Sequence, residues 1–249
     1  MKTQKQLKII AIGGGEIGRP GTKIETEAID REIIKLTGKK HPKLLLIPTA
    51  SNDSGMYRSV VQKYFGKRLG CKTDALYLIE EKLSKNEIEM KIYNTDIIYV
   101  GGGNTLKMLK IWRRLGIDTI LKKAARKGIV LSGVSAGAIC WFSHGLSDSL
   151  RFKNPKNKKL IRVRGLGLIN ILVCPHYYFK KDRRLSLFKI IKEKGGSALA
   201  LENCTALEVI GNNYKILASK TNAKAYLVYR KNKKAHEMEL PANKYFKIL

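Results

Sequence analysis

The sequence has 249 residues, 44% of them hydrophobic, and a net charge of +29 from 49 basic and 20 acidic side chains. This length suits one sizeable α/β core, and no apolar run reaches the roughly 18 residues of a membrane span. The apolar stretch at 9–12 is too short for a signal peptide, and the four cysteines lack metal-ligand or disulfide spacing. We therefore expect a cytoplasmic protein with no metal and no other cofactor.

Apolar runs alternate with amphipathic segments along the first 204 residues. The expected strands are 7–12, 43–48, 74–79, 96–100, 129–134, 168–174 and 198–201. The expected helices are 23–36, 55–69, 85–93, 105–115, 118–127, 136–142 and 182–194. This βαβ rhythm predicts an α/β fold, with a doubly wound, mostly parallel sheet covered by helices.

The pattern changes beyond position 204. Short strands are expected at 205–210, 214–218, 223–229 and 235–240, with turn signals between them. They predict antiparallel hairpins on one edge of the main sheet. We expect a single domain over 1–249, with a parallel core over 1–204 and an antiparallel edge over 205–249.

The pentapeptide G-V-S-A-G at 133–137 follows an expected strand and precedes a run of small, helix-forming residues. Strand, sharp turn and helix, with a serine at the apex, is the arrangement of a nucleophile elbow. Glycines two residues either side of the serine let the backbone turn tightly. An ordinary strand-to-helix turn has the same pattern, but the context favours Ser135 as a nucleophile.

A glycine-rich segment, G-G-G-N-T at 101–105, also follows an expected strand. Ligands bind beyond the carboxyl ends of parallel strands, and glycines leave backbone N–H groups open to a substrate oxygen. We expect Gly102, Gly103 and Asn104 to form one half of an oxyanion hole and the N–H of Ala136 the other. Asn104 can also cap the next helix.

An earlier segment, G-G-G-E-I-G at 13–18, matches the fingerprint of a dinucleotide site. Pro20 interrupts the helix that this fingerprint requires, and no acidic residue ends the second strand. We interpret the segment as the floor of a different ligand pocket.

The general base can be chosen by elimination, because the chain has four histidines. His41 lies at the wrong end of the sheet, and His236 lies in the C-terminal strand region. His144 is too far along the chain from Ser135 if the elbow helix continues. His176 follows the strand expected at 168–174 and emerges at the edge that carries Ser135. An imidazole there can accept the serine proton, which predicts His176 as the base.

A carboxylate should orient this imidazole. Glu202 ends the next strand, and Asp148 lies in the loop after the elbow helix. Either residue could reach His176. We favour Glu202, because its strand is predicted to neighbour the strand that ends at His176.

Four blocks of sequence resemble the peptidase S51 family, which includes aspartyl dipeptidase (peptidase E) and cyanophycinase. The blocks are G-G-G-N-T at 101–105, G-V-S-A-G-A at 133–138, C-P-H-Y at 174–177 and L-E-N-C-T-A-L at 201–207. They occur in the family's order, and the resemblance runs from the first strand to about position 210. It implies a fold similar to class I glutamine amidotransferases, with serine in place of their nucleophilic cysteine.

The resemblance also implies a serine peptidase, similar to dipeptidase E, in which Ser135 is the nucleophile and His176 the base. The implied substrate is a small acidic peptide with an aspartyl residue. An arginine holds its carboxylate, for which Arg183 and Arg184 are the candidates. The dipeptidase branch has its acid shortly after the serine, which favours Asp148. The cyanophycinase branch has it after a later strand, which favours Glu202.

The alternative function is a non-catalytic protein of the same fold that binds nucleic acid or another polyanion through its basic surface. Basic residues occur along nearly the whole chain, with no accompanying aromatic stacking motif. We therefore expect a solvated basic surface, a small acidic peptide as partner and no membrane partner. The oligomeric state is left open.

Overall fold

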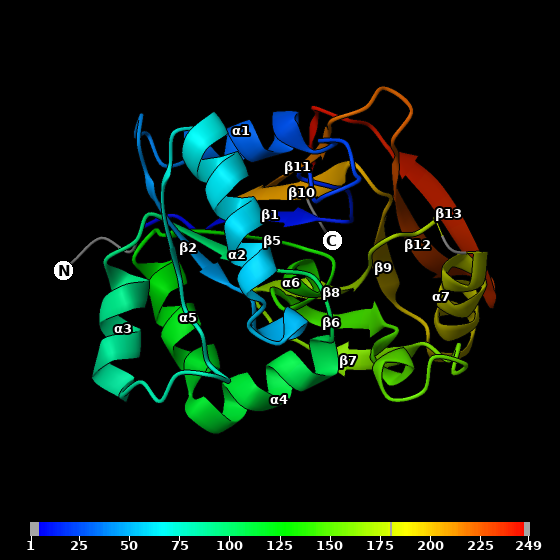
Figure 1. The fold of residues 1–249 in the computed structure, drawn as a ribbon. Helices are drawn as coiled ribbons and strands as arrows, with labels where there is room; N and C mark the ends of the chain where they lie inside the picture. The colour runs from blue at the N-terminus through cyan, green and yellow to red at the C-terminus, as the bar shows by residue number, and fades with distance from the viewer. Residues whose placement is uncertain (1–4, 180, 247–249) are drawn as a thin grey trace.

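The computed structural model describes residues 5–179 and 181–246, and its strands form two sheets (Figure 1). The strands of the first sheet are β1 (Lys8–Ile12), β2 (Lys43–Ile47), β3 (Lys72–Ala75), β4 (Ile97–Val100), β5 (Val130–Val134), β10 (Thr205–Ile210), β11 (Asn213–Ala218) and β14 (Tyr245–Phe246). The strands of the second sheet are β6 (Phe142–Ser147), β7 (Ile161–Arg164), β8 (Ile169–Cys174), β9 (Ser197–Leu201), β12 (Ala225–Lys231) and β13 (Lys234–Leu240).

Both sheets have a parallel centre and antiparallel additions. The first is ordered β14-β11-β10-β1-β5-β4-β2-β3, with parallel pairing from β1 to β3. The second is ordered β13-β12-β9-β8-β6-β7, with β9, β8 and β6 parallel. The expected mixed α/β fold rich in parallel pairs is confirmed, but the single main sheet is wrong.

The second sheet includes β6, a stretch expected from the sequence to be partly helix and partly loop. The elbow helix α6 (Ala136–Ile139) is only four residues long. The chain then turns into β6, F-S-H-G-L-S, which pairs with β8 and not with β5. This stretch lacks the run of β-branched residues that marks a buried strand, so packing, not propensity, places it.

The C-terminal strands also divide between the sheets, so their predicted place on one edge is wrong. β10 pairs with β1 in the first sheet, whereas β12 pairs with β9 in the second. A tight connection at 202–204 carries the chain from one sheet to the other. The site described below lies at this crossing.

Helices cover the outer faces and the space between the sheets. They are α1 (Glu27–Lys35), α2 (Gly55–Val61), α3 (Lys85–Tyr93), α4 (Thr105–Leu115), α5 (Ile117–Arg126), α6 and α7 (Lys181–Lys194). A π-helical segment, η2 (Gln62–Arg68), continues α2, and short 3₁₀ turns occupy η1 (Thr49–Ser51) and η3 (Ser149–Phe152). No helix in the described ranges is both long and apolar enough to cross a membrane.

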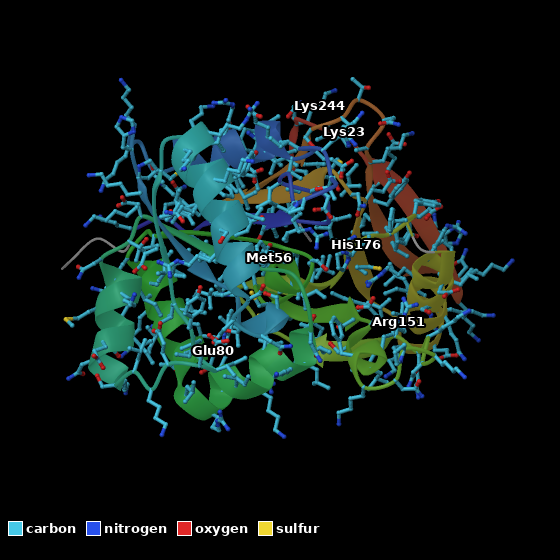
Figure 2. All side chains as sticks on the ribbon, in the orientation of Figure 1. Lys23, Met56, Glu80, Arg151, His176 and Lys244 are labelled. Carbon is cyan, nitrogen blue, oxygen red and sulfur yellow. The ribbon has the colours of Figure 1, made fainter. Side chains whose placement is uncertain are left out.

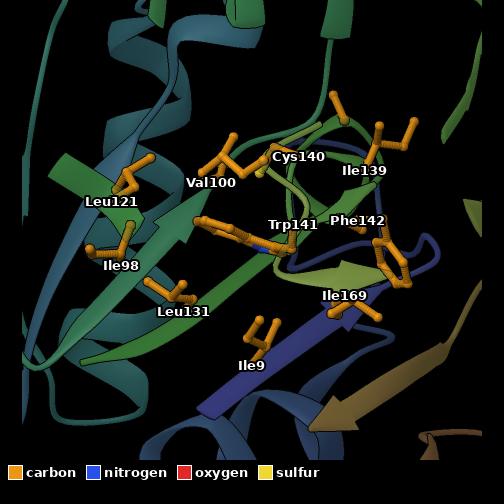
Figure 3. Packing of buried hydrophobic residues seen from close by; sticks show 14 of the residues in the cluster. Ile9, Ile98, Val100, Leu121, Leu131, Ile139, Cys140, Trp141, Phe142 and Ile169 are labelled. Carbon is orange, nitrogen blue, oxygen red and sulfur yellow. The ribbon is translucent and has the colours of Figure 1, made fainter. Parts of the chain in front are cut away.

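Alternating side chains along β1 show how the layers pack. Ile10 and Ile12 face α1, α2 and η2, whereas Ile9 faces the opposite cluster with α4 and α5. In the cluster that contains Ile9, Trp141 lies just after α6, between side chains of the first sheet and Ile169 of the second sheet (Figure 3). The outer face of the second sheet packs against α7. The cluster that contains Ile9 therefore includes buried residues of both sheets and packs them against each other.

Candidate active site

The serine of the G-V-S-A-G motif occupies a strained turn between β5 and α6. Ser135 has φ 57° and ψ −107°, a conformation that a residue with a side chain rarely adopts. Its backbone N–H donates to the carbonyl of Ile12 at 3.0 Å, which ties the turn to β1. A Cβ on Gly137 would lie 2.0 Å from the carbonyl oxygen of Val100, so only glycine permits this close approach. The backbone thus has the geometry of a nucleophile elbow.

The structure brings His176 to this serine. His176 follows β8, has a left-handed backbone (φ 55°), and places Nε2 2.9 Å from the hydroxyl oxygen of Ser135. Its Nδ1 lies 2.6 Å from the carboxamide oxygen of Asn203. Because a carboxamide oxygen only accepts, Nδ1 carries the proton, and Nε2 can accept the proton of Ser135. His176 lies between the strands of the two sheets (Figure 2).

The first glycine segment joins the two sheets at this point. The backbone N–H of His176 donates to the carbonyl of Gly13 at 3.2 Å, and that of Cys204 donates to Gly14 at 2.8 Å. A Cβ on Gly14 would lie 2.1 Å from Oδ1 of Asn203 and 2.4 Å from Nδ1 of His176. This segment therefore lies directly against the imidazole and its partner Asn203.

The second glycine segment borders Ser135 from the other side. A Cβ on Gly102 would lie 3.6 Å from Cβ of Ser135. Burial raises the pKa of Tyr57 to about 12, and a hydrogen bond from the Gly102 backbone partly offsets that rise. In the described part of the chain, the N–H groups of Gly103 and Ala136 donate to no backbone carbonyl. Ala136 directly follows Ser135, and Gly103 follows Gly102, which lies beside it.

Asn104 is used as a helix cap. Its side-chain oxygen accepts from the N–H of Lys107 at 3.0 Å, and its own N–H donates to Ala50 at 2.8 Å. These bonds fix the start of α4 and the end of the glycine segment. Asn104 thus positions the segment through its cap.

The expected carboxylates lie elsewhere. Glu202 accepts from the N–H of Lys224 at 3.0 Å and from the hydroxyl of Tyr226 at 3.4 Å, so its side chain turns towards β12. Asp148 pairs with Arg183 at 3.1 Å. Successive side chains at a strand end point to opposite sides, and Asn203, one residue further on, faces the imidazole. The residue at Nδ1 is a carboxamide and not the predicted acid.

The two expected substrate arginines are engaged in ion pairs. Arg183 is only 2% exposed and also donates to the carbonyl of Leu146 at 3.1 Å. Arg184 pairs with Glu237 of β13 at 2.8 Å and lies over the ring of Phe188. Both arginines fasten α7 to the second sheet, so their place after His176 in the sequence does not bring them to Ser135.

Two residues at the site, Asn203 and Tyr57, are not among those predicted from the sequence. The sequence signal for Asn203 is its place directly after Glu202, and an asparagine can orient a histidine as a carboxylate does. The other histidines have separate surroundings. His41 bonds the carbonyl of Gly70, His144 bonds Arg162, and His236 stacks on Tyr229. Among the described residues, no group of three or more His, Cys, Asp or Glu side chains could hold a metal ion.

Comparisons with known proteins show what this chain is similar to. Residues 9–217 match the profile of Peptidase family S51. An uncharacterized peptidase, YgaJ of Bacillus subtilis (strain 168), is 34% identical over 94% of this chain and 97% of its own. A Peptidase E of Streptomyces coelicolor is 26% identical over 55% of this chain and 57% of its own.

Two solved structures share the fold. The crystal structure of a peptidase from an acI-B1 Actinobacterium has a TM-score of 0.74 at 18% identity and covers 98% of both chains. A putative Peptidase E from Listeria monocytogenes EGD-e has a TM-score of 0.62 at 22% identity, over 86% of this chain and 98% of that one. The finer likeness to class I glutamine amidotransferases stays a prediction.

Proposed function

Because the chain belongs to peptidase family S51, we propose that it is a serine peptidase that hydrolyses small peptides containing an aspartyl residue, with Ser135, His176 and Asn203 as its catalytic group. The observation that carries this proposal is the unbroken chain of contacts from Ser135 Oγ to His176 Nε2 and from His176 Nδ1 to Asn203 Oδ1. The assignment as a peptidase rests on the family; the serine mechanism and the substrate are our proposal.

In this mechanism Ser135 Oγ attacks the carbonyl carbon of the scissile peptide bond while its proton passes to Nε2 of His176. The C–N bond then breaks, and the same proton passes from Nε2 to the leaving amine. Water attacks the resulting ester, gives one proton to Nε2, and releases the acid as that proton returns to Oγ. Each step moves a proton only over the 2.9 Å contact between the two side chains or to a group held beside them.

Asn203 keeps the imidazole in the tautomer that this sequence requires. Its oxygen accepts the Nδ1 proton and leaves the Nε2 lone pair directed at Ser135. A carboxamide supplies orientation but no negative charge, as in the Cys-His-Asn variants of the triad. Negative charge on the tetrahedral intermediate would be met by the N–H groups of Gly103 and Ala136.

The preference for an acidic residue is supported by charge. A net charge of +29 attracts anionic peptides. Arg19 lies on the loop that follows Gly14, and its positive charge opposes the rise in the pKa of Tyr57, a residue that lies against Gly101. Its side chain is 58% exposed and pairs with Glu16. We assign Arg19, in place of Arg183 and Arg184, as the cation that receives the substrate carboxylate.

The test combines labelling with turnover. A serine-reactive fluorophosphonate should label the wild-type protein and not Ser135→Ala, and a panel of aspartyl dipeptides should be cleaved only by the wild type. Ser59→Ala, on the exposed face of α2, is the matched control and should behave as wild type. Equal labelling of Ser135→Ala would overturn the serine mechanism. Absence of labelling and cleavage, with retention on a polyanion column, would favour the binding-protein alternative.

Arg19→Gln tests the acidic preference separately. It should lower kcat/KM for Asp-Leu roughly tenfold while leaving Ala-Leu unchanged, because a charge-assisted hydrogen bond to the substrate is lost. Arg31→Gln removes a cation that is also paired within a surface helix and serves as the control. Equal losses on both dipeptides would contradict the role given to Arg19.

A further inference from the structure

A large apolar side chain is exposed to solvent beside the candidate base. Phe179 is 70% exposed, and the centroid of its ring lies 6.3 Å from that of His176. Its neighbour Tyr178 turns the other way, packing on Tyr226 and donating its hydroxyl to Glu237 at 3.0 Å. The local fold thus anchors one aromatic residue of the pair and leaves the other in water next to the imidazole.

The chemistry of peptide cleavage fixes what must lie near that ring. The leaving amine receives its proton from Nε2 of His176, so its nitrogen must come within hydrogen-bond distance of that atom. The side chain of the leaving residue is two bonds from this nitrogen. It therefore occupies the few ångströms around the imidazole, where Phe179 presents its apolar surface.

We propose that Phe179 forms a binding surface for the side chain of the leaving residue and selects an apolar one, so that preferred substrates pair an aspartyl residue with a following leucine, phenylalanine or similar residue. This inference rests on the proposed function and names the second half of its substrate. Arg19 would then recognise the acidic residue of the substrate, and Phe179 would recognise the leaving residue. Arg19 is assigned to the acidic residue on the acyl side, and the ring of Phe179, 6.3 Å from that of His176, borders the base on the leaving side.

An exposed phenylalanine on its own has several possible explanations, but this one has a specific consequence. A contact made with the leaving residue changes selectivity among leaving residues and leaves the acyl side unaffected. A ring that merely shielded the imidazole from water would change turnover of every substrate by the same factor. The two roles are therefore separated by comparing substrates and not by the size of any single loss.

The experiment measures kcat/KM for Asp-Leu, Asp-Phe, Asp-Ala, Asp-Gly and Asp-Lys. In the wild type, Asp-Leu should exceed Asp-Gly by at least about tenfold, the scale on which apolar contacts discriminate between substrates. Phe179→Ala should reduce that ratio to about 1–3-fold, mainly through KM, because the contact exists before and during reaction. Phe179→Leu should keep most of it. Met90→Ala, an exposed apolar residue on the distant helix α3, is the control and should keep the wild-type ratio.

A binding measurement distinguishes failure of this inference from failure of the proposed function. Calorimetry with Ser135→Ala should show Asp-Leu binding more tightly than Asp-Gly, and Phe179→Ala in the same background should abolish the difference. If the wild type cleaves nothing but this difference is present, the proposed function fails and the binding surface remains. A uniform loss across all leaving residues, an unchanged ratio in Phe179→Ala, or no binding of Asp-Leu would each overturn the inference.

Discussion

Two sheet edges meet at the candidate site, and each holds its residue differently. Ser135, at the end of β5, is fixed by its own strand, turn and helix, with a strained backbone and a glycine two residues away. His176, at the end of β8, is held by segments distant in the chain: Gly13 and Gly14 from one side and Asn203 from the other. Substitutions around the serine should therefore act locally, whereas the base can be displaced from remote positions.

The largest expected effect tests whether the two edges work as one unit. His176→Ala and Ser135→Ala should each lower kcat by roughly 10⁴- to 10⁶-fold, and the double variant should be little worse than either, because residues acting together are strongly non-additive. Steady-state kinetics on Asp-Leu, with circular dichroism to check folding, measures both. Losses that multiply would show that the 2.9 Å contact between them has no catalytic role.

The next effect concerns the orienting group at the second edge. Asn203→Ala should lower kcat roughly 10- to 100-fold, less than the ~10⁴-fold loss for a charged triad aspartate, because a carboxamide orients without adding charge. Glu202→Gln and Asp148→Asn are the matched comparisons, and Glu202→Gln should leave kcat within a few-fold of wild type. A larger loss in either than in Asn203→Ala would restore a carboxylate to the mechanism.

A smaller effect should come from Gly14, which lies between the two sheet edges. Gly14→Ala places a Cβ 2.1 Å from Asn203 Oδ1, so the imidazole and its partner must shift, and kcat should fall about tenfold with a stability loss of roughly 1–3 kcal/mol. Gly55→Ala, whose Cβ would meet no heavy atom within 4 Å, is the control. Comparable kinetics for the two variants would show that the base is held independently of Gly14.

The smallest effect concerns a buried carboxyl group in α1, outside the site. Asp30 is fully buried, and burial raises its pKa to about 7, although hydrogen bonds from Thr26 and Tyr64 oppose the rise. The pKa of Asp30 in the folded protein exceeds its unfolded value of about 3.9, so protonation of Asp30 favours the folded state. This contribution to the free energy of unfolding is complete below about pH 3.9 and is lost as pH rises to about 7.

Asp30→Asn should flatten the decline of unfolding free energy between pH 4 and pH 8, by at most ~4 kcal/mol at 1.36 kcal/mol per pKa unit. Urea unfolding at several pH values measures the change, with the partly exposed Asp118→Asn as control. Parallel pH curves for wild type and Asp30→Asn would contradict the raised pKa.

The sequence predicted most elements that lie in the parallel centres. Runs such as β1, β2 and β5 are nearly continuous apolar stretches, which is the signature of strands buried on both faces. It did not predict β6 and β7, in which apolar residues are interspersed with polar residues or glycine and which pair as strands beside β8. The division into two sheets followed from these two strands and could not be inferred without them.

For the candidate site, the sequence by itself determined what is local. The elbow needs only a strand, a turn and a helix in consecutive residues, so Ser135 and its glycines could be identified from their order. His176 could be selected because four histidines allow elimination. The orienting residue and the substrate cation could not be determined, because they depend on the directions of side chains after separate strands. Only the tertiary structure turned Glu202 towards β12, Arg183 into an ion pair with Asp148 and Asn203 towards the imidazole, since side chains at consecutive positions leave a strand on opposite sides.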